Sequence, residues 1–148
     1  MFRMKKLLYF AFAVLLLSSC SEYQKVLNKG TVEQQYALAT KMYEAKKYNK
    51  ALDLFEKITP TYAGKPQMER IQFMVAQSNF NVKNYALAGY YYQRFTLNYP
   101  KSSKKEEAAF LSAYSYKLAS PVFSLEAKDT HKALEAFQSF IDEYPDSE

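Results

Sequence analysis

Two side chains stand out as candidates for covalent or acid–base chemistry, because the chain holds only one cysteine and one histidine, Cys20 and His131. Cys20 follows a basic start and an uncharged apolar run from Leu7 to Leu17. This run is too short to cross a bilayer as a helix, and its basic flank is typical of a secretory signal. The thiol of Cys20 therefore stands at the expected end of a signal peptide.

The four residues Leu17-Ser18-Ser19-Cys20 resemble the bacterial lipobox. The resemblance implies that residues 1–19 are removed as a signal peptide and that Cys20 carries a diacylglycerol on its sulfur. It also implies that the new amino terminus is acylated, for example with palmitate. Several acyl chains on one residue give stable anchoring, where one would be marginal. The alternative is an ordinary signal peptide with an incidental Cys20, which the lack of an A-x-A triplet before a plausible cut disfavours.

Catalytic chemistry finds little support elsewhere in the chain. His131 stands at the predicted start of the last helix and is expected to be an exposed residue near that helix end. The sequence shows no metal-spaced ligand set and no glycine-rich phosphate loop. We therefore expect no enzymatic activity, no metal and no cofactor beyond the covalent lipid on Cys20.

The charge balance argues against nucleic acid as a partner. Of the formal net charge of +5, three positive charges (Arg3, Lys5 and Lys6) belong to the predicted signal peptide. No run of Lys or Arg exceeds two residues, so no basic tract is available for a phosphate backbone. Disulfides are excluded, because the chain has no second cysteine.

An internal repeat dominates the rest of the sequence. Small residues recur at a spacing of 37 as Ala39, Ala76 and Ala113, and each follows an aromatic residue three positions earlier. A second small residue begins another shared pattern, small-x3-aromatic, at Ala51, Ala88 and Ala133. Small residues at fixed places let two helices approach closely, and the aromatic four residues on lies on the same helix face.

This pattern resembles the tetratricopeptide repeat, a helix–turn–helix unit of about 34 residues with a terminal proline. Pro100 and Pro145 stand where the family places that proline, whereas Pro60 comes three residues early. The resemblance implies an all-α solenoid of three antiparallel helix pairs over residues 31–148, in units of about 31–64, 65–101 and 102–148. Residues 20–30 are interpreted as a short lipidated tether.

Capping signals and periodicity set the expected helix boundaries. Thr31-x-x-Gln34 and Ser103-x-x-Glu106 read as capping boxes that open the first helices of units one and three. Pro66 suits the first position of a helix. The expected helices run over about 31–45, 48–58, 66–82, 85–99, 103–118 and 129–144. Eight extra residues lengthen the turn of the third unit within 119–128, as either a loop folded onto its own unit or a docking loop.

The combination of lipobox, tether and repeats resembles the BamD family of outer-membrane assembly lipoproteins, in a Bacteroidota-type sequence. The repeat ends Asn98-Tyr99-Pro100 and Glu143-Tyr144-Pro145 contribute to this resemblance. It implies a scaffold that binds the barrel-inserting subunit of the assembly machinery and receives unfolded outer-membrane proteins. Family members usually carry about five units, so the chain is interpreted as truncated at its carboxyl end, with most of the half that docks the barrel-inserting subunit missing.

The first helices of the three units are expected to form an inner face that binds peptides. Counting from the small residues places aromatic side chains in two columns along this face, with polar residues at their edges. The candidate binding residues are Tyr36, Phe73 and Phe110 in the first column, Tyr43 and Phe80 in the second, and Arg70 and Gln77 at the edges. The rings could instead pack between neighbouring helices, and the sequence leaves both readings open.

Two other functions remain open. The chain could be a tetratricopeptide lipoprotein that organises cell-wall or division proteins, with no role in barrel insertion. It could also be the accessory domain of an enzyme whose catalytic part lies beyond residue 148.

The expected location is the outer membrane, on its periplasmic side. Ser21 follows the cysteine where the enterobacterial sorting rule would use Asp to retain a lipoprotein in the inner membrane. The only acid nearby is Glu22, which gives little support to a surface-export signal.

The first testable prediction concerns the anchor. We expect Cys20→Ala to leave the protein uncleaved or soluble, because the acceptor of the lipid is gone. Fractionation and metabolic labelling with palmitate measure this. A Cys20→Ala variant that still fractionates with the outer membrane and still takes up label would contradict the lipobox interpretation.

Overall fold

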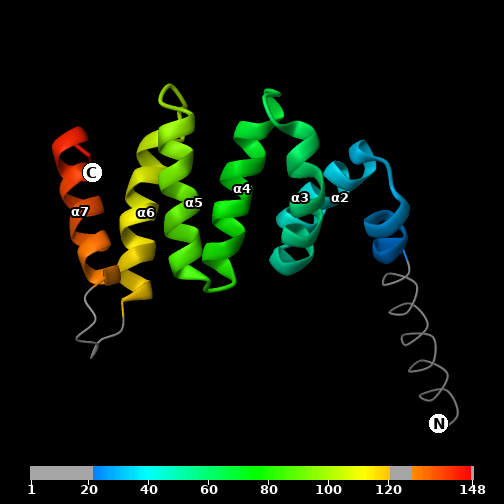
Figure 1. Ribbon diagram of the computed structural model, residues 1–148, viewed down its shortest axis with the longest axis horizontal. Coiled ribbons are helices and arrows are strands. Elements are labelled where there is room, and N and C mark those ends of the chain that lie inside the picture. Colours follow the sequence, from blue (N-terminus) through cyan, green and yellow to red (C-terminus); the bar gives the residue numbers. More distant parts are fainter. Residues whose placement is uncertain (1–21, 121–127, 148) are drawn as a thin grey trace, which may run out of the picture.

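The computed structural model describes residues 22–120 and 128–147 of the chain. Helices arranged side by side form an elongated row, with the amino-terminal segment and α7 at opposite ends (Figure 1). Regular structure in the described residues is all helical, which confirms the predicted fold class. The helices are α2 (Val32–Glu44), α3 (Tyr48–Tyr62), α4 (Gln67–Asn81), α5 (Tyr85–Asn98), α6 (Lys105–Ala119) and α7 (Lys128–Glu143).

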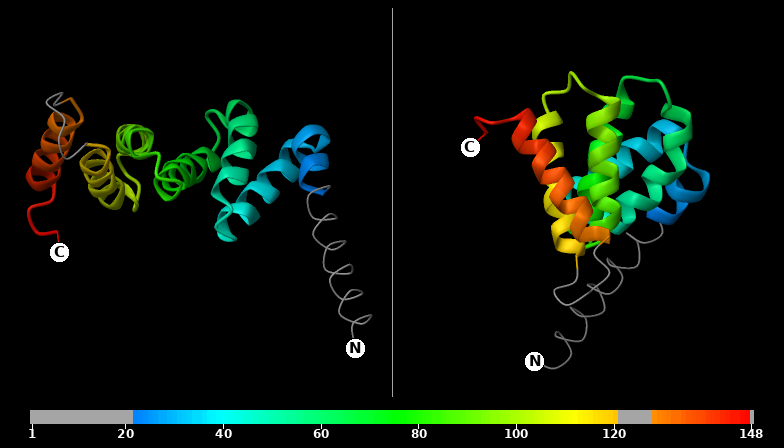
Figure 2. Two further views of the ribbon diagram at one scale, coloured as in Figure 1. Left: turned by 90° about the horizontal axis from the view of Figure 1, so that it is seen from below. Right: turned by 60° about the vertical axis from the view of Figure 1, so that its left-hand side comes forward.

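Each helix packs against the next one along the chain, so the molecule is a solenoid of antiparallel pairs (Figure 2). Both sets of repeated alanines lie in these contacts. Ala39, Ala76 and Ala113 in the first helices are completely buried, as are Ala51 and Ala88 in the second helices, and Ala133 is nearly so. The predicted role of the small residues as close-approach points is therefore confirmed.

The repeat extends to the backbone of the turns. Lys46 and Lys83, 37 residues apart, both adopt a left-handed conformation, with φ values of 58° and 66°. Each comes within two residues of the end of the first helix of its pair, where a left-handed residue commonly ends a helix. Ser120, at the same place in unit three, has φ −71° instead. The third turn thus departs from the repeat where the eight-residue insertion begins; residues 121–127, with Phe123 and Leu125, lie outside the described part.

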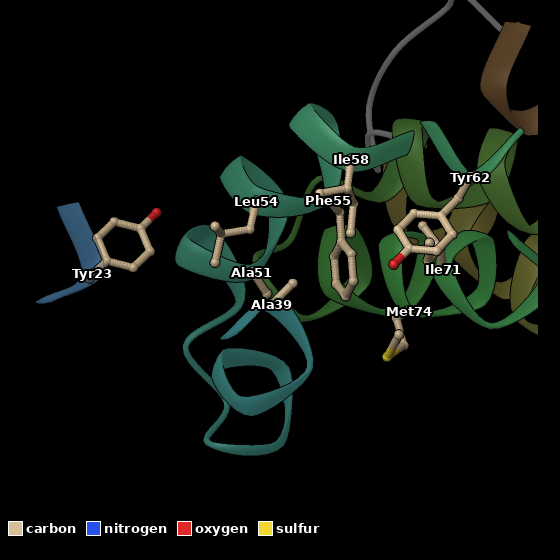
Figure 3. Packing of buried hydrophobic residues seen from close by; sticks show 9 residues of the cluster. All are labelled: Tyr23, Ala39, Ala51, Leu54, Phe55, Ile58, Tyr62, Ile71 and Met74. Carbon is tan, nitrogen blue, oxygen red and sulfur yellow. The ribbon is translucent and has the colours of Figure 1, made fainter. Parts of the chain in front are cut away.

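The interpretation of residues 20–30 as a tether is wrong for the residues that the structure describes. Residues 22–29 are helical, and Tyr23 is only 6% exposed. Figure 3 shows Tyr23 at the edge of the buried cluster of the first unit, on the side of Ala51 and Leu54. The segment packs on the apolar surface of the first helix pair and covers it, as the terminal unit of a solenoid requires.

The end of the second predicted helix differs from the expectation. The helix predicted to end at Ile58 continues as α3 to Tyr62, with Pro60 inside it. Pro60 lacks an N–H and leaves the Glu56 carbonyl without its helical donor. The extension nevertheless buries Tyr62, whose ring lies 5.3 Å from that of Tyr36. Burial of this ring offsets the lost hydrogen bond.

Of the two predicted capping boxes, only the first is present. Thr31 accepts a hydrogen bond from the Gln34 N–H, and the Gln34 side chain accepts one from the Thr31 N–H. At the second, α6 begins later than predicted, with Lys104 as its N-cap and no side-chain cap. The Lys104 N–H instead donates a 3.1 Å hydrogen bond to the Ser102 hydroxyl, and the Lys104 ammonium forms an exposed ion pair with Glu107 at 2.6 Å.

The last helix leaves an apolar side open. Leu134 and Ile141 on α7 are 63% and 58% exposed. Phe137 and Phe140 are half-buried, whereas Tyr92 and Phe95 at the same repeat positions are fully buried. The difference has a simple cause: α6 covers α5, and no described helix covers α7 in the same way.

The buried alanines yield the second prediction. Enlarging Ala88 to Leu should overpack the contact between α4 and α5 and lower the free energy of unfolding by about 1–3 kcal/mol. Leu97, on the same helix, is 74% exposed, so Leu97→Ala is a matched control that should change it by less than about 0.5 kcal/mol. Urea denaturation measures both, and equal stabilities for the parent and Ala88→Leu would refute the packing register.

Candidate functional site

The candidate site is the inner face, formed by side chains of α2, α4 and α6. The structure brings its members together across neighbouring units. Arg70 on α4 forms an ion pair with Glu44 on α2, at 3.8 Å. Phe80 on α4 lies 6.1 Å, centre to centre, from Tyr114 on α6. The face is therefore continuous across all three units.

The first predicted column packs mainly inside its own helix pairs. Phe73 contacts the rings of Tyr92 and Phe95 edge-on, at 5.8 and 5.3 Å. Phe110 makes the repeat-equivalent contacts with Phe137 and Phe140, at 6.5 and 5.7 Å. Tyr36 similarly packs on Tyr62. The first column thus packs between the two helices of each pair. Of its three rings, only that of Phe110 is largely exposed, at 43%.

The second column is neither fully buried nor fully exposed. Tyr43 and Phe80 are both partly exposed, as expected of rings that could bind a peptide. Each also forms an edge-to-face pair with the first residue of the following helix, Tyr43 with Tyr48 and Phe80 with Tyr85, at 5.9 and 5.6 Å. The two pairs are related by the repeat. They give each ring a fixed orientation, worth about 0.5–1.5 kcal/mol per pair.

Polar groups lie among these rings. Tyr92, on α5, is completely buried, and its hydroxyl donates a 2.9 Å hydrogen bond to the Gln77 side-chain oxygen. Gln77 is therefore held as an acceptor for Tyr92 and is only half-buried. Arg70 remains largely exposed despite its ion pair. Lys104 extends over the ring of Phe73 at 5.4 Å, which places a cation on the inner face.

Sequence reasoning missed Tyr114. Its ring stacks on Phe110 at 6.0 Å and an interplanar angle of 6°, and it also faces Phe80. The Lys117 ammonium lies over it at 5.7 Å. Tyr114 thus joins the two predicted columns. The signal was available, since Tyr114 occupies the same repeat position as Gln77, 37 residues later.

Two grooves on the structure contain none of the predicted site residues. They are repeat-equivalent and of similar size, about 520 Å³ between α3, α4 and α5, and about 510 Å³ between α5, α6 and α7. The first is mostly apolar, lined by Leu52, Met68, Ile71, Val75, Leu87 and Tyr91 among others. The second is more polar, with Gln93, Ser112, Lys132, Glu135 and Ser139. Equal geometry with different lining shows that the repeat sets the grooves' shape but not their chemistry.

The described residues contain no cluster of His, Cys, Asp or Glu that could hold a metal ion. His131 is exposed on α7, as expected. None of the described helices is both long and apolar enough to cross a membrane. Partly exposed rings interspersed with Arg, Lys and Glu can bind an extended peptide that carries aromatic and polar side chains.

Comparison with known families now adds to this geometry. A family model described as YfiO, outer membrane lipoprotein, matches residues 28–148, most of the chain and all of the helical repeats. The chain belongs to the YfiO family of outer membrane lipoproteins. A second model, a prokaryotic membrane lipoprotein lipid attachment site, matches residues 4–21. No curated protein matches the chain at a significant level.

Membership of the YfiO family and the attachment site together support a lipid-anchored location at a membrane. Cys20, the predicted lipid acceptor, lies within the matched attachment site but outside the described residues. The match to the family model begins at residue 28. It therefore covers the end of the 22–29 helix and every residue of the inner face.

Several tyrosines of this YfiO-family solenoid resist ionisation. Burial raises the pKa of Tyr92 far above its ordinary value, with a smaller contribution from Tyr43 and Glu107. Burial also raises the pKa of Tyr43, assisted by Tyr48 and Glu107. The Tyr92 hydroxyl thus stays protonated, and a donor to Gln77, to higher pH than the hydroxyl of an exposed tyrosine.

The third prediction follows from these shifts. Unfolded tyrosines lose their protons near pH 10, whereas the buried ones stay protonated, so the unfolded state binds fewer protons there. The contribution of these tyrosines to the free energy of unfolding should therefore be constant below about pH 9, and the free energy should fall as the pH rises above about 10. Tyr92→Phe should make this fall shallower in urea titrations. A slope equal to the parent's would contradict the assignment.

Proposed function

We propose that this lipoprotein is a BamD-type scaffold, of the Bacteroidota kind, in the machinery that assembles β-barrels in the outer membrane. The family match over residues 28–148 is the observation that carries this proposal. In this proposal the mature protein begins at a lipidated Cys20, which carries palmitate or a similar acyl chain. It faces the periplasm and acts by binding, without enzymatic activity, cofactor or nucleic acid.

The clients in this proposal are unfolded outer-membrane proteins, received on the inner face. Barrel strands end in aromatic-rich segments, and rings suit such segments because stacked and edge-on ring contacts add to simple burial. The partly exposed rings Tyr43, Phe80, Phe110 and Tyr114 follow one another across α2, α4 and α6. Arg70 and Lys117 add cations beside them for acidic or carboxylate groups.

The second partner is the barrel-inserting subunit of the same machinery. The open apolar side of α7, with Leu134 and Ile141, is one of the surfaces that further units or this subunit could cover. A mild-detergent pull-down from native membranes tests the partnership. Recovery of the barrel-inserting subunit supports it, whereas recovery of cell-wall or division proteins in its place would favour the alternative scaffold.

The fourth prediction tests the inner face. The double variant Tyr43→Ala with Phe80→Ala should weaken crosslinking to unfolded barrel peptides by more than about 1 kcal/mol in binding free energy, because both rings would be lost as anchors. The repeat supplies a matched control, Tyr48→Ala with Tyr85→Ala. It breaks the same two ring pairs but leaves Tyr43 and Phe80 in place.

The first variant should lower the melting temperature somewhat more than the control, because it also loses the contact between Phe80 and Tyr114. Only the first should lose peptide crosslinking when both are compared as folded protein. If the first variant, compared as folded protein, crosslinks the peptides as well as the parent does, Tyr43 and Phe80 are not anchors and the inner face is not the client site.

A further inference from the structure

Helix 22–29 is fixed to the first unit at three places, although it comes directly after the predicted lipid acceptor. The first is Tyr23, whose hydroxyl donates a 2.9 Å hydrogen bond to the Asp53 carboxylate on α3 and approaches the Lys50 carbonyl at 3.3 Å. The Lys50 ammonium also lies 4.8 Å from the centre of the Tyr23 ring. Three contacts with Lys50 and Asp53 on α3 thus hold Tyr23 in place.

The second attachment lies at the other end of this short helix. The Gln35 side chain on α2 donates hydrogen bonds to the carbonyls of Val26 and Leu27, at 3.3 and 3.1 Å. These carbonyls belong to the last turn of helix 22–29, where few helical donors remain. The Leu27 carbonyl accepts from Gln35, and the Val26 carbonyl accepts from both Gln35 and the Gly30 N–H. Gln35 therefore caps the segment from a neighbouring helix.

The third attachment is the turn that follows. The Gly30 N–H donates a 2.9 Å hydrogen bond to the Val26 carbonyl. A Cβ at Gly30 would come within 2.5 Å of the same oxygen, so only glycine fits without a shift. Leu27 also packs on the core of the first unit. Helix 22–29 is therefore a rigid part of the solenoid.

The distance between the lipid and this rigid part is short. Cys20 and Tyr23 are three residues apart, a span of at most about 11 Å even if fully extended. Tyr23 contacts the first turn of α3, and the turn between α2 and α3 (residues 45–47) directly precedes it. This turn and the adjoining α3 start carry Lys46, Lys47 and Lys50, with the first two exposed.

We propose that helix 22–29 is a rigid bracket that holds the turn between α2 and α3 against the lipid headgroups, and so sets how the solenoid stands on its membrane. The partner surface is a phospholipid layer, whose phosphates suit the lysines of this turn. Basic residues near a membrane surface are attracted to anionic headgroups. The inference depends on the lipid anchor and not on which client the inner face binds.

The fifth prediction compares two equivalent turns in the full-length, lipidated protein. The lipid occupies the only native thiol, so a single introduced cysteine can carry a fluorophore. Lys46→Cys labels the turn nearest the anchor, and Lys83→Cys labels the equivalent turn of unit two, which shares its left-handed backbone. The protein is inserted into phosphatidylethanolamine vesicles that contain a lipid with a nitroxide on its headgroup, with and without phosphatidylglycerol.

We expect strong quenching at position 46 and weak quenching at position 83, in both kinds of vesicle. Inserting about ten Gly and Ser residues between Ser21 and Glu22 adds roughly 17 Å of average reach and should abolish the difference while the bracket stays folded. Tyr23→Ala should reduce the quenching at position 46, because the clamp on α3 is lost.

Three results would overturn the inference. Equal quenching at both positions would mean that the first unit is not held closer than the second. Unchanged quenching after the insertion would mean that something other than the short anchor holds the turn. Quenching at position 46 that needs phosphatidylglycerol would assign the effect to the lysines alone, without a bracket.

Discussion

Close approach of helices at small residues is the constraint on which the rest of this structure depends. A buried alanine in each helix lets its partner lie close enough for aromatic side chains on both to pack around the crossing. Ala76 and Ala88 are both completely buried, and Phe73, Tyr92 and Phe95 meet edge-on beside them. Larger side chains there would push the helices apart and separate these rings. The spacing of 37 residues repeats this arrangement and so builds the row of pairs.

The same constraint explains why the inner face carries rings at all. A residue that must pack inside its pair and one that can meet a peptide differ by only seven positions on the same helix, as Phe73 and Phe80 do. Phe73 is enclosed by Tyr92, Phe95 and the Lys104 side chain. Within its own pair, Phe80 contacts only the ring of Tyr85. Its other ring contact is with Tyr114 of the next unit. The rings proposed to bind peptides and the rings that pack the solenoid thus share one helical register.

The sequence predicted what the period controls and failed where single contacts decide. The spacing of the alanines predicted the helix pairs and the buried crossings between them. It also predicted that Tyr43 and Phe80 are partly exposed. The capping box at Ser103 is absent because α6 begins later, with Lys104 as its N-cap, and the Ser102 hydroxyl accepts the Lys104 N–H. The helix at 22–29 was missed because a buried Tyr23 depends on Asp53, thirty residues away, which no local pattern reveals. Tyr114 was missed because its repeat equivalents in the first two units, Thr40 and Gln77, are polar, so this position was interpreted as a polar edge.

Helix α2 connects helix 22–29, next to the lipid anchor, to the inner face. Its first half carries Gln35, which caps the segment that follows the lipid anchor, and its last turn carries Tyr43 and Glu44 of the inner face. Eight residues separate Gln35 from Tyr43, about 12 Å along one straight helix. A helix of this length transmits orientation without a hinge, so the position of the anchor and the direction of the inner face are coupled by ordinary packing. In the proposed role of receiving chains beside a membrane, this coupling would keep the inner face in a constant direction relative to the lipid surface.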